Sequence, residues 1–193
     1  MLLHPQQPVS LALARQLEAV IFDLDGVITD TAGLHDQAWQ TLADKKDAGC
    51  RQLLEQLTPA DILPGIPELL DSLAQRGIAC GLASASLNAP LLLQRLGIGR
   101  RFQAIADPAA LQKGKPDAEI FLTAAELLGV PPQGCIGIEA AAAGIASIKA
   151  AGMLAVGIGC REQLAAADLL LPSTAELTAE KLLELFGGKA RRK

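Results

Sequence analysis

Residues 19–30 of the chain read AVIFDLDGVITD, and this stretch decides what kind of fold the rest can form. The run from 19 to 24 is almost continuously apolar rather than alternating, which is typical of a strand covered on both faces. Asp23 and Asp25 come at its end, two residues apart, so in an extended segment both side chains could point the same way. Gly26 then lets the backbone turn sharply. The stretch predicts a buried strand that leaves its sheet beside a pair of carboxylates.

Further apolar runs of the same kind follow along the chain and alternate with helical patterns. The runs that predict strands are 78–84, 102–107, 135–138, 154–158 and 168–172. The helical patterns are 66–77, 88–96, 117–129, 142–151, 161–166 and 178–186. Repeated strand–helix units are joined by right-handed crossovers. The expected fold class is therefore α/β, with a Rossmann-like parallel sheet flanked by helices.

One region departs from this alternation. Two helical stretches, 38–42 and 49–57, follow each other without a strand between them. They predict an α-helical insertion, residues 33–62, placed directly after the first strand. Because ligands bind beyond the carboxyl ends of parallel strands, the insertion is expected to lie over the functional site.

The composition excludes several classes of protein. Half of the 193 residues are hydrophobic and 20% are charged, which excludes a disordered or collagen-like chain. The net charge of −4 argues against binding to nucleic acid through its phosphates. The longest uncharged run, 77–94, holds Ser, Asn and Pro in its middle, so we expect no membrane span. The N-terminus lacks the basic start of a signal peptide.

The cysteines also bear on the environment of the protein. Cys50, Cys80, Cys135 and Cys160 are widely spaced and form no CxxC pair, which argues against a zinc site. Three of the four have apolar neighbours, where cysteine serves as a small buried hydrophobic residue. We therefore expect a reduced, cytoplasmic protein. We also expect a monomer.

The carboxylate pair permits two interpretations from the residues alone. Neighbouring carboxylates at a strand end repel each other unless a cation or a shared proton relieves them, and a hard cation such as Mg²⁺ suits oxygen ligands. Such a pair can also divide labour, one as a nucleophile and one as a general acid or base. Alternatively, aspartates in this position serve only as turn and capping residues.

The longer string FDLDGVITDT, 22–31, resembles the first motif of the haloacid dehalogenase superfamily, in its β-phosphoglucomutase-like branch. The likeness covers residues 19–186 and continues through LPGIPELL (63–70), GLASASLNAP (81–90), IADPAALQKGKPDAEIF (105–121), IGIE (136–139) and AGMLAVGIG (151–159). It implies a catalytic core, a reduced helical cap, an N-terminal extension and a basic tail. Their expected boundaries are 19–32 with 63–188, 33–62, 1–18 and 189–193, respectively.

The resemblance also implies a reaction and the residues that perform it. Asp23 would be the nucleophile that forms an aspartyl phosphate, and Asp25 would be the general acid and base. Both would bind Mg²⁺, the implied cofactor, Asp25 through its backbone carbonyl, and Glu139 would complete the metal site. Ser84 and the amide of Ala85 would hold the transferring phosphoryl group.

Five further residues are implied in binding. Lys115 would neutralise charge on the phosphoryl group, and Thr31 and His35 match positions at the hinge and start of the cap. Ser86 and Asn88 match positions that hold the other phosphate of the substrate. The residues by themselves leave two roles open, because Lys115 could be an exposed loop lysine and His35 a partly buried helix histidine.

Two departures from the family pattern bear on activity. The segment EAAAAG, 139–144, has Ala140 where the family carries an aspartate that binds the metal, and a methyl group offers no oxygen. The cap is also short, so water would compete for the aspartyl phosphate.

The resemblance therefore predicts a Mg²⁺-dependent phosphotransferase of the β-phosphoglucomutase type, which converts β-glucose 1-phosphate to glucose 6-phosphate. Two alternatives stay open. The short cap favours a small-molecule phosphatase, and Ala140 favours a non-catalytic or redesigned scaffold of the same fold. The expected partner is a small phosphorylated sugar or phosphoester, with no nucleic acid and no membrane.

Overall fold

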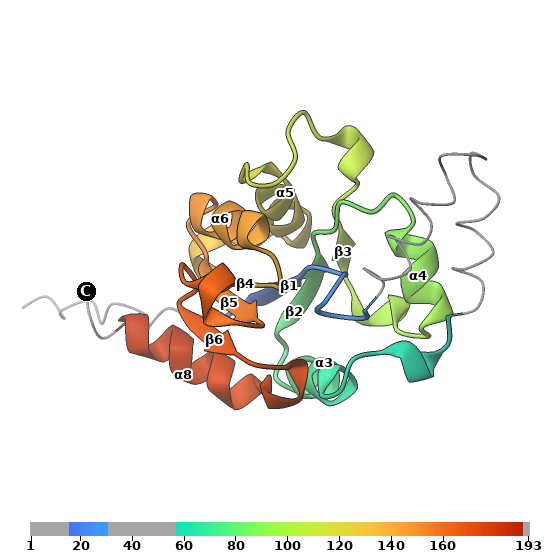
Figure 1. Cartoon of the computed structure of the whole chain (residues 1–193), viewed down its shortest axis with the longest axis horizontal. Helices are drawn as coiled ribbons and strands as arrows, with labels where there is room; N and C mark the ends of the chain where they lie inside the picture. Colours follow the sequence, from blue (N-terminus) through green and yellow to red (C-terminus); the bar gives the residue numbers. More distant parts are fainter. Residues whose placement is uncertain (1–15, 31–56, 191–193) are drawn as a thin grey trace, which may run out of the picture.

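The computed structural model describes residues 16–30 and 57–190 (Figure 1). Its centre is a parallel sheet of six strands in the order β3-β2-β1-β4-β5-β6. The strands are β1 (Ala19–Phe22), β2 (Ala79–Leu82), β3 (Ala104–Ile105), β4 (Cys135–Glu139), β5 (Leu154–Ile158) and β6 (Leu169–Leu171). This is the order of a doubly wound α/β fold, in which ligands bind where the winding reverses, between β1 and β4. The predicted fold class and the six predicted strands are confirmed.

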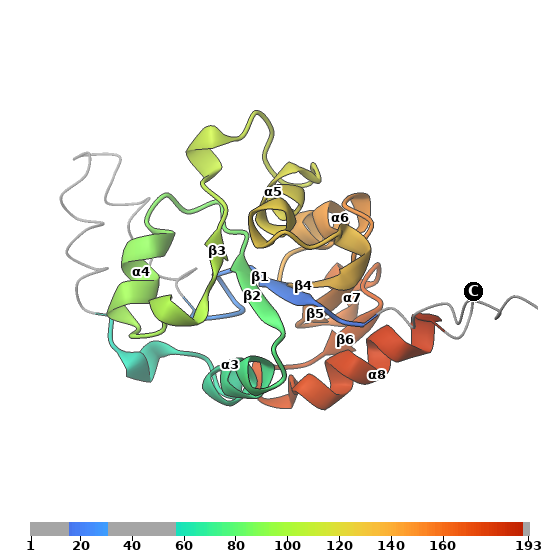
Figure 2. The same cartoon turned by 180° about the vertical axis from the view of Figure 1, so that it is seen from behind.

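Helices cover both faces of the sheet (Figure 2). One face carries α3 (Ile66–Gln75), α4 (Ala89–Arg95) and α8 (Ala179–Ala190), and the other carries α5 (Glu119–Leu128), α6 (Ala142–Ala150) and α7 (Arg161–Leu164). The side chains of β1 pack alternately against the two helical layers, one on each face of the sheet, because successive side chains of a strand point to opposite faces. Val20 and Phe22 pack in the α3–α4–α8 layer, whereas Ala19 and Ile21 pack in the α5–α6–α7 layer.

A close approach packs the last turn of α6 against β4. A Cβ added at Gly137 of β4 would lie 2.6 Å from Cγ1 of Ile148, so only glycine lets the helix lie this near the strand.

Several helix ends differ from the predicted ones, most of them by one or two residues. The last helix was expected to end at residue 186, but α8 continues through Gly187 and Gly188 to Ala190, into the segment expected to be a basic tail. The two glycines do not stop it, because neither has the positive φ of a helix-ending glycine. The helix predicted at 117–129 corresponds to α5, which starts at Glu119. Residues 117 and 118 therefore belong to the loop that also carries Lys115.

The predicted insertion lies mostly outside the described residues. Of the range 33–62, the structure describes 57–62, which contains a short 3-10 helix, Pro59–Asp61. Within the described ranges, no helix combines the length and the apolar character needed to cross a membrane.

The cysteines match the expectation in part. Cys80 and Cys135 are buried free thiols, and burial raises the pKa of each to about 12, so both are neutral core residues. Cys160, in contrast, is exposed.

Candidate active site

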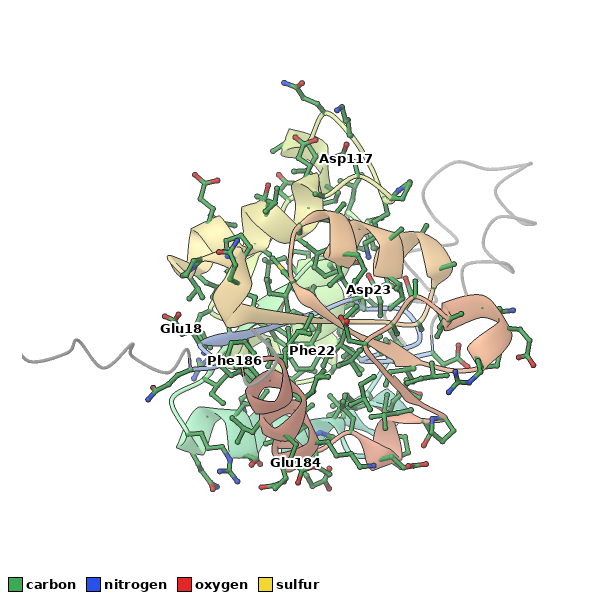
Figure 3. The ribbon with its side chains drawn as sticks, turned by 90° about the vertical axis from the view of Figure 1, so that its left-hand side faces the viewer. Glu18, Phe22, Asp23, Asp117, Glu184 and Phe186 are labelled. Atoms are coloured by element: carbon green, nitrogen blue, oxygen red, sulfur yellow. The ribbon has the colours of Figure 1, made fainter. Side chains whose placement is uncertain are left out.

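Three of the predicted site residues follow neighbouring strands at one edge of the sheet. Asp23 directly follows β1, Ser84 comes two residues after β2, and Glu139 is the last residue of β4. The amide of Asp23 donates to the carbonyl of Ile138 at 2.9 Å, so the β1–β4 ladder continues up to the acidic residues. Figure 3 shows Asp23 at this end of β1. The order β2-β1-β4 therefore places Asp23 between the strand that leads to Ser84 and the strand that ends in Glu139.

Lys115 joins the two carboxylates. Its Nζ lies 2.7 Å from Oδ1 of Asp23 and 2.7 Å from Oε1 of Glu139. The three side chains are 13%, 12% and 2% exposed, respectively, so water screens these charges little. The ammonium also lies 5.3 Å from the ring centroid of Phe121 in α5. Lys115 is thus a buried partner of two acids, and the exposed-lysine interpretation is wrong.

Glu139 is fixed by the start of α6 as well as by Lys115. Its Oε2 accepts hydrogen bonds from the amides of Ala140 and Ala141, each 2.7 Å long, which satisfies donors at the helix start that have no partner within the helix. A Cβ added at Gly144 would lie 1.8 Å from Oε1 of Glu139. The carboxylate therefore needs glycine at position 144 to occupy this place.

Asp25 lies in a tight turn beyond β1. Gly26 adopts φ +77°, and its amide donates to the carbonyl of Thr29 at 2.8 Å. Asp25 pairs with Thr29 in an isolated bridge, and Thr29 pairs with Ile62 in another. The hydroxyl of Thr29 donates to the carbonyl of Asp61 at 2.8 Å. The turn thus connects the half-buried Asp25 to residues at the far end of the predicted insertion.

The loop from β2 to α4 is shaped by its own hydroxyl groups. The buried Ser84 accepts a hydrogen bond from the amide of Ser86 at 3.1 Å, and Ser86 accepts one from the amide of Asn88 at 3.3 Å. Ala85 is exposed between them, and Asn88 directly precedes α4. These four predicted residues therefore form one short loop at the carboxyl end of β2.

The electrostatics of the pair follow from burial and charge. Burial raises the pKa of Asp23 from 3.8 to about 6, with a smaller contribution from Glu139, although the ammonium of Lys115 acts to lower it. Burial acts to lower the pKa of Lys115, but Asp23 and Glu139 outweigh it, so that pKa lies above its ordinary value. Lys115 therefore stays charged at neutral pH.

The described residues do not fit the predicted magnesium ion as a cation held by the protein alone. Mg²⁺ takes six oxygens in near-octahedral geometry, of which water and a bound phosphate commonly supply several and one or two carboxylates the rest. In residues 16–30 and 57–190, no three His, Cys, Asp or Glu side chains are grouped so as to hold a metal ion. One oxygen of Glu139 accepts two amides, and the other shares Lys115 with Asp23. Ala140 adds only a methyl group at this point.

Two predicted residues cannot be placed, whereas two residues that were not predicted shape the site. Thr31 and His35 lie outside the described residues. Gly144 was not predicted, although an isolated glycine in a helical pattern is itself a signal of close approach. Ser147, buried in α6, donates its hydroxyl to the carbonyl of Asp117, at 2.5 Å, and so ties the loop that carries Lys115 to α6. No pattern in the sequence indicated that contact.

Comparisons with known proteins agree with this arrangement. The profile of the haloacid dehalogenase-like hydrolases matches residues 44–152. The chain is 42% identical to the β-phosphoglucomutase of Bacillus subtilis (strain 168) over 214 aligned positions, which cover 87% of this chain and 95% of that protein. It is 27% identical to hexitol phosphatase B of Escherichia coli (strain K12), over 90% of this chain and 100% of that protein.

A solved structure is similar over nearly the whole chain. The crystal structure of β-phosphoglucomutase from Clostridium difficile has a TM-score of 0.86 and 37% sequence identity, and the match covers 92% of this chain and 100% of that chain. The family profile, the identity to the Bacillus protein and this shared architecture lead to one conclusion: the chain belongs to the haloacid dehalogenase-like hydrolase family.

Proposed function

We propose that this protein transfers the phosphoryl group of a small phosphorylated sugar through Asp23, in the manner of a β-phosphoglucomutase. The observation that carries the proposal is the buried carboxylate of Asp23 at the carboxyl end of β1, with Lys115 at 2.7 Å. The 42% identity to the Bacillus β-phosphoglucomutase, over 95% of that protein, supports the choice of reaction and substrate class.

Each residue of the site has its own role in the proposed reaction. A carboxylate oxygen of Asp23 attacks the phosphorus, the bond from phosphorus to the sugar oxygen breaks, and Asp25 donates a proton to that oxygen. Lys115 neutralises charge on the phosphoryl oxygens, which Ser84 and the amide of Ala85 also hold. The aspartyl phosphate then passes its phosphoryl group to another hydroxyl of the sugar, whose proton returns to Asp25.

The other predicted residues would bind the remainder of the substrate. Ser86 and Asn88 lie in the same loop as Ser84, which supports the expectation that they bind a phosphate of the substrate, and Thr31 and His35 are assigned to the substrate by the family resemblance alone. Magnesium remains an expectation from that resemblance. None of the steps above passes through a metal ion.

Hydrolysis is the second candidate, and one observation favours it. The alignment with the Bacillus protein has 214 positions, more than the 193 residues of this chain, so that relative carries residues within the match that have no counterpart here. If the missing residues belong to the cap, water reaches the aspartyl phosphate and replaces the sugar hydroxyl as acceptor.

The experiment follows the products made from β-glucose 1-phosphate by the purified chain. Glucose 6-phosphate, detected with its dehydrogenase, is the expected product, and free phosphate with glucose would establish the phosphatase instead. Asp23→Asn is expected to lower either activity by at least about a thousandfold, because the nucleophile is lost. A parent protein no more active than Asp23→Asn would overturn the proposal and favour a non-catalytic scaffold.

A further inference from the structure

Lys115 lies in a backbone turn whose two ends are supported differently. The amide of Asp117 donates to the carbonyl of Gly114 at 3.0 Å, so Lys115 is a central residue of this turn. The backbone that leaves the turn is attached to α6 by the hydrogen bond from Ser147 to the carbonyl of Asp117. The backbone that enters the turn needs a support of its own.

Glu119, the first residue of α5, supplies that support. Residues 112–114, which enter the turn, are exposed, so their side chains bury little surface that could hold them in place. The carboxylate of Glu119 reaches back to this segment. Its Oε1 accepts the amide of Gln112 at 3.0 Å, and its Oε2 accepts the amide of Lys113 at 2.7 Å. One side chain thus binds two successive amides directly before the turn.

Only an ionised carboxylate makes this pair of hydrogen bonds in full. Both oxygens of a carboxylate accept, whereas an amide side chain has one acceptor and one NH₂ group, which would face a second donor. The charge on the acceptor also strengthens both bonds. The same first turn of α5 carries Phe121, whose ring centroid lies 5.3 Å from the ammonium of Lys115. The start of α5 therefore contacts both the backbone before Lys115 and its ammonium.

We infer that Glu119 is a positioning residue for Lys115: it fixes the backbone at 112–113 and so holds the ammonium at the carboxyl end of β1. Glu119 acts through the loop and makes no bond to the substrate. The expected effect on the reaction rests on the proposed function, whereas the expected effect on the place of Lys115 requires no activity at all. Without the two hydrogen bonds, the loop opens more often and the ammonium is in place for less of the time.

The first experiment measures how fast each lysine reacts with acetic anhydride, by mass spectrometry of the purified protein. The side chain of Lys115 is 13% exposed and should react slowly, whereas that of Lys113 is 70% exposed and serves as a reference in the same loop. Glu119→Gln should speed the reaction of Lys115 at least about fivefold, because the loop opens more often. Lys113 should react as in the parent. Glu119→Asp keeps both acceptor oxygens and should restore part of the protection.

Two control variants separate this role from a general loss of charge or of stability. Glu126→Gln makes the same substitution at an exposed residue of α5. Ile66→Val removes one carbon from a buried side chain of α3, on the other face of the sheet, and so weakens the fold at a distance from the loop. In both variants Lys115 should react as slowly as in the parent.

The second experiment measures turnover of β-glucose 1-phosphate. Glu119→Gln should lower kcat about tenfold, because a displaced Lys115 neutralises less charge in the transition state. It should change KM by less than about threefold, since other residues of the site also hold the substrate. A parent without activity would overturn the proposed function, and the labelling alone would then decide the role of Glu119.

The inference itself is overturned if Lys115 reacts no faster in Glu119→Gln than in the parent. It is also overturned if Glu126→Gln or Ile66→Val speeds that reaction equally, or if the parent is active and Glu119→Gln keeps its full kcat.

Discussion

The missing side chain of Gly144 leaves room for the carboxylate of Glu139. This room determines the geometry of the cluster formed by Asp23, Lys115 and Glu139. Alanine in place of glycine inside a helix ordinarily stabilises a protein by about 0.5–1 kcal/mol, since glycine has more conformational freedom to lose. At position 144 the added methyl would lie 1.8 Å from Oε1 of Glu139, and this carboxylate cannot retreat without losing Lys115 or the two amides.

We therefore expect Gly144→Ala to lower the free energy of unfolding by about 1–3 kcal/mol, because the buried side chain of Glu139 must shift to admit the methyl group. Urea unfolding followed by circular dichroism measures it. Gly187→Ala in α8 is the matched control, since nothing lies within 4 Å of its added Cβ, and it should stabilise the protein slightly. Equal effects of the two substitutions would show that Glu139 moves aside without cost.

At the scale of elements, α6 positions two parts of the site. The amides of Ala140 and Ala141, directly before its first residue, bind Glu139, and Ser147 within the helix donates a hydrogen bond to the carbonyl of Asp117. The loop that presents Lys115 is thus attached to the same helix that holds one of the carboxylates Lys115 contacts.

Ser147→Ala is expected to lower the free energy of unfolding by about 1–2 kcal/mol, because the carbonyl of Asp117 loses its buried partner. Amide hydrogen exchange in residues 112–118 should accelerate more than in the sheet. Ser72→Ala is the control, because Ser72 is half-buried and, among the described residues, its hydroxyl accepts a hydrogen bond from the side chain of Arg76 and from no buried group. Unchanged exchange in 112–118 would mean that α6 does not hold this loop.

The sequence was a good guide to the elements and a partial guide to the site. Continuous apolar runs marked all six strands, since every strand of a parallel sheet is covered on both faces. The predicted strand 102–107 shrinks to Ala104–Ile105, because β3 lies at the sheet edge and pairs only with β2. The neighbourhood of Asp23 and Glu139 could be expected from the strand ends. The contacts of Lys115 with both Asp23 and Glu139 could not be derived from the residues. A loop has no repeating pattern of apolar residues from which its path could be predicted.

For the molecule as a whole, the charge on Asp23 couples the site to global stability. A carboxyl whose pKa rises on folding holds its proton more tightly in the folded state than in the unfolded state, so stability declines as the pH rises between the two pKa values. Burial moves the pKa of Asp23 from 3.8 to about 6, which sets the window from about pH 4 to about pH 6.

The difference in unfolding free energy between Asp23→Asn and the parent should therefore grow in favour of Asp23→Asn across this window, by up to about 3 kcal/mol. Urea unfolding of both proteins at pH 4, 5, 6 and 7 measures it, and a difference independent of pH would contradict the shift. For the same reason, the proposed phosphoryl transfer, which needs the ionised carboxylate of Asp23, should fall off below about pH 6.

The reversal of winding between β1 and β4 has a consequence for assembly. Asp23 and Lys115 are 92 residues apart in the chain, whereas Lys115 and Glu139 are 24 apart. A cut between β3 and Lys115, within residues 106–114, would leave Asp23 on one fragment and Lys115 and Glu139 on the other. Neither fragment could form the cluster alone, so an intact Asp23–Lys115 contact would report that two halves of the molecule had recombined around their central strands.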